Sequence, residues 1–329
     1  MTRIGMYVHH HGSGHAMRAG ALRSALAGRG IAATTLGSRD DADLRLPMDP
    51  PGIPGGDPTA GGALHWAPPG SAGMARRMAM ISGFLAGGDA AAGDAADMPA
   101  VLHVDVSVEV ALLARLMGVP VVTLAMPGER FDDPHQLGYR QASALIAAWP
   151  NWVPVPPHLR AHSGFLHQVG GISRFDAPAE PGPDCDVVVL SGRGGTGWTE
   201  AQWDQVRAAC PDRDFLFLGG DAFVDDPMPY LSSARVVVSA AGQNSVADLA
   251  VAGAKTILLP QERPFREQHA TAQLLDAAGI AVAADAFPAA GEWPALLEQA
   301  ESLDSRWPRW QTSGAAARAA DVIRKVAGQ

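Results

Sequence analysis

Short apolar runs alternate with amphipathic stretches from one end of the chain to the other. Near the N-terminus, residues 4–8 and 31–36 are apolar runs that each predict a β-strand. Between them, residues 15–27 carry alanine and leucine at helical spacing, which predicts an amphipathic helix. A strand, a helix and a second strand in this order are typical of a βαβ unit with a parallel sheet.

The same alternation continues through both halves of the chain. In the first half, further strands are predicted at residues 101–104, 119–124 and 144–148, with a helix at 106–117. In the second half, the strands are predicted at residues 186–190, 215–218, 236–239 and 256–259. The helices of this half are predicted near residues 199–209, 244–252, 267–278 and 294–303. Two such series predict an α/β protein with two tandem Rossmann-like domains that face a central cleft.

Proline-rich segments mark the expected boundary between the two domains. Proline cannot continue a helix or donate to a sheet, so residues 149–157 and 175–183 are predicted to interrupt the pattern. We expect an N-terminal domain over 1–155, a linker region over 156–183 and a C-terminal domain over 184–310. Residues 311–329 are expected to form a helix that crosses back to the first domain, and residues 39–69 to form a long loop.

Composition and charge narrow the class of protein. The chain has 329 residues, of which 47% are hydrophobic, and no apolar run is long enough to span a membrane. A net charge of −9 argues against nucleic acid as a partner. Two cysteines argue against a disulfide scaffold, and the N-terminal apolar stretch is too short for a signal peptide. These features predict a cytoplasmic location.

A glycine-rich turn follows the first predicted strand. Residues 12–15 have the sequence Gly-Ser-Gly-His, but Met17 stands where a dinucleotide-binding fingerprint would have its third glycine. His15 therefore projects from the start of a helix, where the helix dipole favours the neutral imidazole that a general base needs. The alternative is a capped turn in which His15 bonds only to the backbone.

Two further glycine turns follow strands of the second half. Residues 191–197 carry four glycines and an arginine, a pattern that favours phosphate binding by backbone N–H groups, although a flexible turn would look the same. Residues 239–248 are predicted to contain the second of these turns, between the end of a strand and the start of a helix. Asp248 could accept hydrogen bonds from two ribose hydroxyls, or could complete a capping box with Ser245.

Other polar residues follow predicted strands. Asp105 ends a strand at the expected ligand edge, where it is either a second functional carboxylate or the N-cap of the next helix. Gln268 lies in a polar stretch over 259–269, where it could bind sugar hydroxyls or simply begin a surface helix. No metal site is predicted, because successive residues of the histidine tract 9–11 point to opposite faces and the Asp-Cys-Asp of 184–186 precedes a strand instead of following one.

The turns of the second half together resemble the nucleotide-sugar half of GT-B glycosyltransferases of family 28, the MurG-like UDP-sugar transferases. The strongest match spans residues 236–279, and residues 12–15 resemble the glycine-rich loop and histidine of that family. The resemblance implies an N-terminal domain that binds the acceptor and a C-terminal domain that binds the donor. It also implies inverting transfer of a sugar from a nucleoside-diphosphate donor without a metal or other cofactor.

The resemblance also implies roles for individual residues. His15 would act as the catalytic base, with Asp105 as the second catalytic candidate. The donor diphosphate would be held by Gly12, Ser13, Gly14, Ser191, Gly192, Arg193, Gly194, Thr196, Gly242, Gln243, Asn244 and Ser245. Asp248 would bind the ribose, and Glu267 and Gln268 would contact the donor sugar. The sequence departs from the family at Asp248, where glutamate is usual, and at Thr271, where asparagine is usual.

Two other activities remain open. Residues 12–18 also resemble the Gly-x-Gly-His-x-x-Arg loop of a nucleotide-sugar hydrolase with the same architecture, which transfers the sugar to water. A third possibility is a protein that binds sugar nucleotides without turnover.

The acceptor side is defined less closely by the sequence. The polar loop over 128–135 follows a strand, which makes Glu129, Arg130 and His135 candidates for contact with a small-molecule, glycan or lipid-linked acceptor. Residues 74–85 have an apolar face beside Arg76 and Arg77, which is typical of peripheral contact with the inner membrane face or of a core-facing helix with solvated arginines.

Overall fold

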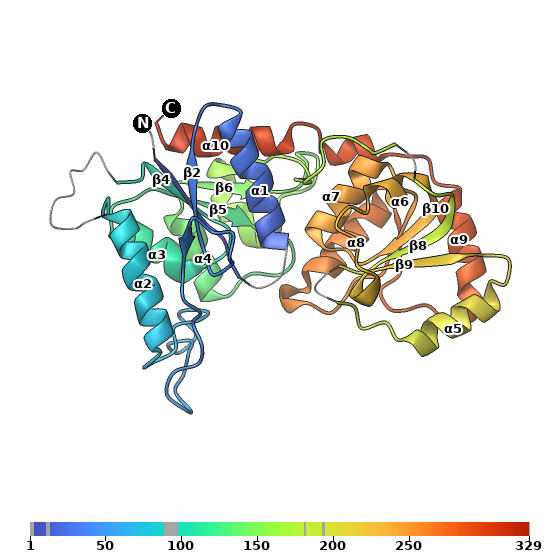
Figure 1. Ribbon diagram of the computed structural model, residues 1–329, viewed down its shortest axis with the longest axis horizontal. Coiled ribbons are helices and arrows are strands. Elements are labelled where there is room, and N and C mark those ends of the chain that lie inside the picture. The colour runs from blue at the N-terminus through green and yellow to red at the C-terminus, as the bar shows by residue number, and fades with distance from the viewer. Residues whose placement is uncertain (1–2, 11–13, 89–97, 181, 193–194, 329) are drawn as a thin grey trace. The chain divides into compact units, whose positions relative to one another are not determined.

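The computed structural model describes residues 3–10, 14–88, 98–180, 182–192 and 195–328. The described residues form two compact units. Unit 1 comprises Met1–Ala125, Arg130–Val169 and Ala316–Gln329, and unit 2 comprises Met126–Glu129 and Gly170–Ala315. The α/β class predicted from the sequence is confirmed, because each unit is built on its own parallel sheet with helices (Figure 1).

Unit 1 contains a seven-stranded parallel sheet in the order β3-β2-β1-β4-β5-β6-β7. The strands are β1 (Ile4–Tyr7), β2 (Ala33–Gly37), β3 (Leu44–Arg45), β4 (Val101–Val104), β5 (Val121–Ala125), β6 (Ala144–Ala147) and β7 (Leu166–Gln168). Its helices are α1 (Gly14–Ala27), α2 (Ala72–Leu85), α3 (Val108–Leu116), α4 (Asp133–Gln141) and α10 (Ala315–Val326), with a 3₁₀ segment, η2 (Pro157–Phe165).

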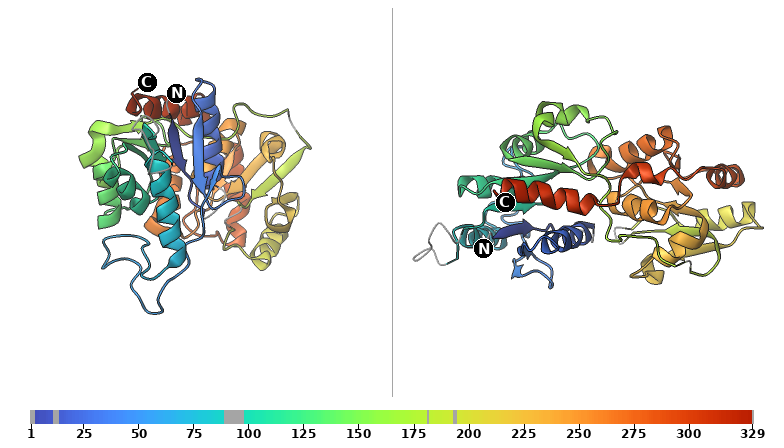
Figure 2. Two further views of the ribbon diagram at one scale, coloured as in Figure 1. Left: turned by 60° about the vertical axis from the view of Figure 1, so that its left-hand side comes forward. Right: turned by 90° about the horizontal axis from the view of Figure 1, so that it is seen from above.

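The C-terminal helix α10 packs on unit 1, although it follows the residues of unit 2 in sequence. Asp321 of α10 accepts hydrogen bonds of 2.8 and 2.9 Å from the guanidinium of Arg29, just after α1. Arg318 donates to the carbonyl of Val169 over 2.8 Å. Figure 2 shows this red helix on the same unit as the blue β1 and α1.

Unit 2 contains a five-stranded parallel sheet in the order β12-β11-β10-β8-β9. The strands are β8 (Cys185–Leu190), β9 (Phe215–Leu218), β10 (Ala234–Ser239), β11 (Thr256–Leu258) and β12 (Val282–Ala283). The helices are α5 (Glu200–Ala209), α6 (Met228–Ser233), α7 (Gln243–Ala252), α8 (Glu267–Ala277) and α9 (Trp293–Glu301). Short 3₁₀ segments are η3 (Gly220–Ala222), η4 (Pro264–Arg266), η5 (Ala290–Glu292) and η6 (Trp307–Trp310).

The strand order of each sheet reverses once, and these two points position the candidate sites. In unit 1, β1 lies between β2 and β4, so the loops after β1 and β4 diverge at the carboxyl edge. In unit 2, the loops after β8 and β10 diverge in the same way. Open α/β sheets bind ligands at such a crevice. The glycine-rich turns of the sequence follow β1, β8 and β10, three of these four strands.

The structure adds elements that the sequence pattern did not predict. A short strand, β3, lies within residues 39–69, which were expected to form a loop. The predicted loop over 128–135 is wrong at its end, because α4 begins at Asp133. Asp132 caps this helix and Pro134 lies in its first turn, so residues that are common in loops here start a helix.

Helix α2 turns its apolar face into unit 1. Ile81, Phe84 and Leu85 are buried in the core cluster beside the sheet. Arg77 is only 1% exposed and donates to the hydroxyls of Tyr7 and Ser38, which corrects the expectation of a solvated arginine. These burials remove most of the face that would contact a membrane. Among the described residues, no helix combines the length and apolar character of a membrane span.

The core of unit 2 is organised around aromatic side chains. Trp293 is fully buried, and its ring centroid lies 5.1 Å from that of Trp203 and 5.5 Å from that of Phe287. We expect Trp293→Ala to destabilise the protein by about 3–5 kcal/mol, because it removes a large buried ring and leaves a cavity. Chemical denaturation followed by circular dichroism measures this change.

The matched control is Leu216→Ala on β9, whose side chain is 36% exposed. We expect a loss of about 1 kcal/mol or less there. Equal losses for the two variants would contradict the central role of the aromatic cluster.

Candidate functional site

The described residues around the strand reversal of unit 1 bring together His15, Arg18 and Asp105. Asp105 follows β4 and is 2% exposed. Arg18, on α1, donates to its Oδ1 from Nη2 over 2.6 Å and from Nε over 3.3 Å. The Nδ1 atom of His15 is in direct contact with Oδ2. His15 is itself partly exposed, so this group joins a buried carboxylate to an accessible imidazole.

Arg18 and His15 keep Asp105 ionised. Burial alone would raise the pKa of its carboxyl, but Arg18 and His15 hold that pKa well below its usual range. Ser107, and not Asp105, is the N-cap of α3, since its side chain accepts from the N–H of Val110. The N-cap interpretation of Asp105 is therefore wrong.

Only part of the predicted glycine turn of unit 1 is described. Gly14 begins α1, directly before His15. Gly12 and Ser13 lie outside the described residues, as do Arg193 and Gly194 of the turn in unit 2.

In unit 2, the glycine turn after β8 is tied to the loop after β11. The Oε1 atom of Gln261 accepts from the N–H of Gly197 over 2.6 Å. Arg263 donates to the carbonyl of Gly195 over 3.0 Å. Ser191 packs against Gly219, where a side chain would lie only 2.0 Å from the Ser191 hydroxyl. The predicted Ser191, Gly192 and Thr196 thus lie on a loop held by neighbouring turns.

Helix α7 begins at the turn after β10. Its N-cap is Gly242, and Gln243, Asn244 and Ser245 form its first turn. The dipole of a helix favours anions at its N-terminus, so this end of α7 suits a bound anion. The capping box proposed for Ser245 and Asp248 is wrong, because the helix starts earlier.

Asp248 lies further along α7 and is 6% exposed. Its Oδ1 accepts from the hydroxyl of Ser173 over 2.7 Å, and its Oδ2 lies 3.6 Å from Nε of Arg174. Burial raises the pKa of Asp248 to about 6, despite the hydrogen bond from Ser173 and the charge of Arg174. Asp248 is thus a buried carboxylate one turn beyond the start of α7.

Gln268 lies beside the α7 turn and not on the surface. It is 7% exposed, its Oε1 accepts from the N–H of Gln261 over 2.9 Å, and its Nε2 faces Gly242. Glu267 precedes it at the start of α8. The surface-helix interpretation of Gln268 is therefore wrong.

The predicted acceptor residues fall into different units. Residues 126–129 belong to unit 2, where the N–H of Glu129 donates to the carbonyl of Phe265 over 2.8 Å. Gly128 has a positive φ, and a side chain there would lie 2.1 Å from the same carbonyl. Arg130 and His135 belong to unit 1.

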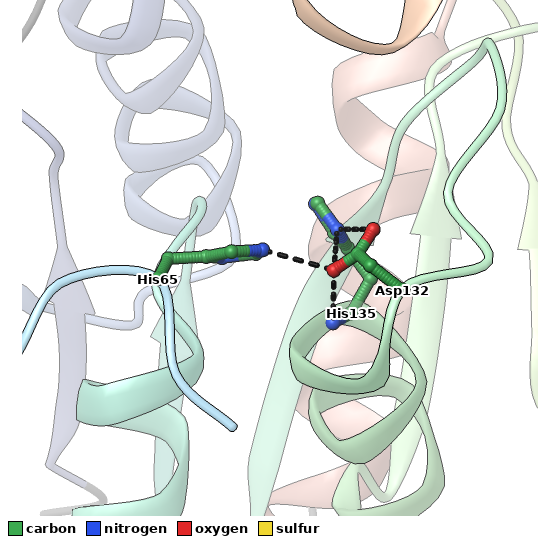
Figure 3. A group of neighbouring side chains, drawn as sticks. All are labelled: His65, Asp132 and His135. Atoms are coloured by element: carbon green, nitrogen blue, oxygen red, sulfur yellow. Dashed lines mark hydrogen bonds and ion pairs between the residues drawn. The ribbon is translucent and has the colours of Figure 1, made fainter. Parts of the chain in front are cut away.

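His135 is part of a polar cluster in unit 1 (Figure 3). Its Nδ1 lies 2.7 Å from Oδ2 of Asp132, and Nε2 of His65 lies 3.0 Å from Oδ1. On the other side of the ring, Nη1 of Arg130 donates to Nε2 of His135 over 3.1 Å. Because arginine can only donate, the proton of this imidazole resides on Nδ1.

A pocket of about 570 Å³ opens near the strand reversal of unit 1. Met48, Met74 and Met78 contribute apolar surface, together with Trp66 and two prolines. Its polar lining residues are Tyr7, His9, His10, Asp49, Arg77, Ser107 and Glu109. The ring of His9, which lines this pocket, also packs against the ring of His15, with centroids 5.5 Å apart.

Several of these residues were not selected from the sequence. Ser173 and Arg174 lie 74 or more positions before Asp248, and no motif surrounds them. Glu109 follows Ser107 in an ordinary helix start, yet its carboxylate accepts from the N–H groups of His65 and Trp66. Arg18 could have been selected from the sequence, because it stands three residues after His15 and therefore lies on the same face of the predicted helix.

Comparisons with known proteins agree with this architecture. Residues 202–292 match the model of the glycosyltransferase family 28 C-terminal domain. No curated protein matches the chain. Solved structures that are 14–18% identical to this chain establish its GT-B fold. The family match indicates that the activity is sugar transfer.

Among solved structures, MurG of Acinetobacter baumannii is similar with a TM-score of 0.63 and 15% identity, over 99% of this chain and 100% of that one. CalG4, the calicheamicin glycosyltransferase, has a TM-score of 0.64 and 18% identity, over 100% and 99%. UGT89C1 of Arabidopsis thaliana has a TM-score of 0.69 and 14% identity, over 99% of each chain. The chain is therefore a glycosyltransferase with the GT-B fold, and residues 202–292 of its second unit match the family 28 C-terminal domain.

Proposed function

We propose that the protein transfers a sugar from a nucleoside-diphosphate donor, with UDP as the expected nucleotide, to an acceptor hydroxyl with inversion at the anomeric carbon. The observation that carries this proposal is the contact of His15 with the buried Asp105–Arg18 pair. An imidazole oriented by a carboxylate is suited to remove a proton from a hydroxyl group.

The chemistry follows from the tautomer of His15. Its Nδ1 faces the Asp105 carboxylate, so the proton resides on Nδ1 and the lone pair of Nε2 can accept. Nε2 takes the acceptor proton as the acceptor oxygen bonds to the anomeric carbon. The bond from that carbon to the diphosphate oxygen breaks, and its electron pair leaves with the nucleoside diphosphate. Asp105 stabilises the imidazolium that forms, and Arg18 keeps Asp105 ionised.

Unit 2 is proposed to hold the donor. The N–H groups at the start of α7 and on the loop after β8 would bind the diphosphate, which carries the charge that develops in the reaction. Asp248 would accept hydrogen bonds from the ribose hydroxyls, and Gln268 with Glu267 would contact the sugar. Backbone N–H groups can supply this stabilisation, so we expect transfer to need no divalent metal at the diphosphate.

Unit 1 is proposed to hold the acceptor in the pocket beside His9. The pocket joins an apolar methionine and tryptophan wall to carboxylates and imidazoles, so it suits an acceptor with both an apolar part and hydroxyl groups. Arg130 and His135 stay candidates for acceptor contact, whereas Glu129 belongs to unit 2.

A nucleotide-release assay tests this function. We expect one nucleoside-diphosphate sugar from a panel of UDP, dTDP and GDP donors to release its nucleotide in the presence of EDTA, and the rate to rise with a suitable acceptor. The anomeric configuration of the product, determined by NMR, checks inversion. Fast release without any acceptor would support the hydrolase, and tight donor binding without release would support the non-catalytic protein.

A further inference from the structure

Three potential metal ligands converge in unit 1, outside the groups proposed to act on the donor. His65 comes from the loop before α2, whereas Asp132 and His135 come from the start of α4 (Figure 3). Their candidate ligand atoms all lie within 4.8 Å of one another. The nitrogen atoms lie 3.0 Å (His65 Nε2) and 2.9 Å (His135 Nδ1) from Oδ1 of Asp132.

These distances are close to those of a zinc coordination shell. Zinc binds imidazole nitrogen and carboxylate oxygen at about 2.0–2.2 Å, which places neighbouring ligands of a tetrahedron about 3.3 Å apart. The two nitrogen–oxygen distances would lengthen by a few tenths of an ångström on binding, and the ligand atoms, which lie within 4.8 Å of one another, would move to one common spacing around the ion. An ion can also reach it, since the side chains of His65 and Asp132 are 35% and 33% exposed.

Hydrogen bonds with neighbouring residues fix the positions of Asp132 and of the loop that carries His65. Asp132 is the N-cap of α4, since its Oδ1 accepts from the N–H of His135. The N–H of His65 donates to the carboxylate of Glu109 over 2.8 Å, which fixes the loop onto α3. Supporting contacts of this kind orient metal ligands in proteins.

We propose that His65, Asp132 and His135 bind a divalent transition-metal ion with the ligand preferences of zinc. Two imidazoles and one carboxylate favour zinc, cobalt or nickel over magnesium and calcium, which prefer oxygen ligands. Three protein ligands leave a fourth position for water or for an oxygen atom of a bound molecule. This site is separate from the proposed diphosphate chemistry, which uses residues of unit 2.

Arg130 sets the affinity of this site. When the ion binds Nδ1 of His135, the ring proton moves to Nε2, which would then face the donating Nη1 of Arg130. The ring of His65 changes its tautomer in the same way, so neither ring gains or loses a proton. Arg130 must turn aside, and its positive charge also repels the ion. We therefore expect Arg130→Gln to bind the metal more tightly than the natural protein.

Cobalt titration tests the proposal on the full-length protein without an affinity tag. We expect visible absorption of four-coordinate cobalt that saturates at one ion per chain and is displaced by zinc. His65→Ala and Asp132→Asn should each weaken binding by about tenfold or more, since even outer contacts to metal ligands contribute that much. Asparagine keeps the N-cap of α4, so Asp132→Asn preserves the fold.

Two controls separate this site from other histidines. His167→Ala on β7, outside the cluster, should leave the titration unchanged. His9→Ala with His10→Ala should also leave it unchanged, although this tract is a plausible competitor. Far-UV circular dichroism confirms that each variant is folded.

Three results would overturn the proposal. They are no cobalt absorption in the natural protein, full binding by His65→Ala, and loss of binding only in the His9–His10 variant. A cluster that serves only as a hydrogen-bond network would not bind metal more tightly in Arg130→Gln. If this variant does not bind metal more tightly than the natural protein, that result also counts against the site.

Discussion

Replacing His15 by alanine is expected to reduce sugar transfer by about 10²- to 10⁴-fold, which is the usual contribution of a general base. The reason is geometric, because the buried Asp105 contacts Nδ1 and leaves Nε2 of the ring to accept the acceptor proton. Donor affinity should change little, since the donor is assigned to unit 2. Initial rates of nucleotide release and calorimetric titration with the nucleoside diphosphate measure the two quantities separately.

A matched variant of Asp105 tests the orientation of the His15 ring separately from proton transfer to that ring. Asp105→Asn keeps the shape of the side chain, but its amide group favours the wrong tautomer of His15 and leaves Arg18 facing a neutral partner. We expect its transfer rate to fall by at least about 10²-fold. Normal turnover by His15→Ala would remove this residue from the mechanism, whatever Asp105→Asn does.

The sequence predicted both parallel sheets because their signal is local. Each buried strand is a short continuous apolar run, and each glycine turn follows such a run directly. β10 and α7 show this most clearly, since the Val-Val-Val-Ser run and the turn at Gly242 are adjacent in the chain. α4 was missed because Asp132 and Pro134 are equally common in loops and at helix starts.

The candidate sites were predictable only where one segment carries them. His15 could be selected from its own turn, but its relation to Asp105 depends on β1 and β4 being neighbours in the sheet. The pairing of Asp248 with Ser173 and that of His65 with Asp132 join positions more than 60 residues apart. No periodicity or spacing records such pairs, because they arise from the packing of distant loops.

Asp248→Asn is expected to weaken donor binding and to stabilise the folded protein at the same time. A buried carboxylate accepting hydroxyl groups contributes about 1.5–3 kcal/mol, so nucleoside-diphosphate affinity should fall by about 10- to 100-fold. Calorimetric titration at pH 7.5 measures this loss. Unchanged affinity would contradict the assignment of Asp248 to the ribose.

The gain in stability follows from the raised pKa of Asp248. Its pKa of about 6 in the folded state exceeds the ordinary value of 3.8, so the folded chain holds the proton more tightly than the unfolded chain. Stability therefore falls as the pH rises from about 4 to about 6, and above pH 6 the charged group costs up to about 3 kcal/mol. The asparagine variant lacks this penalty.

The unfolding free energies of the two proteins should therefore agree near pH 4 and diverge up to about pH 6, with the variant more stable above. Urea denaturation at several pH values measures the difference. A variant that is less stable at every pH would show that the contacts of Asp248 with Ser173 and Arg174 outweigh the cost of burying its charge. A protein that keeps a destabilising carboxylate in this position is expected to use it in binding, because donor binding is what the variant loses in exchange.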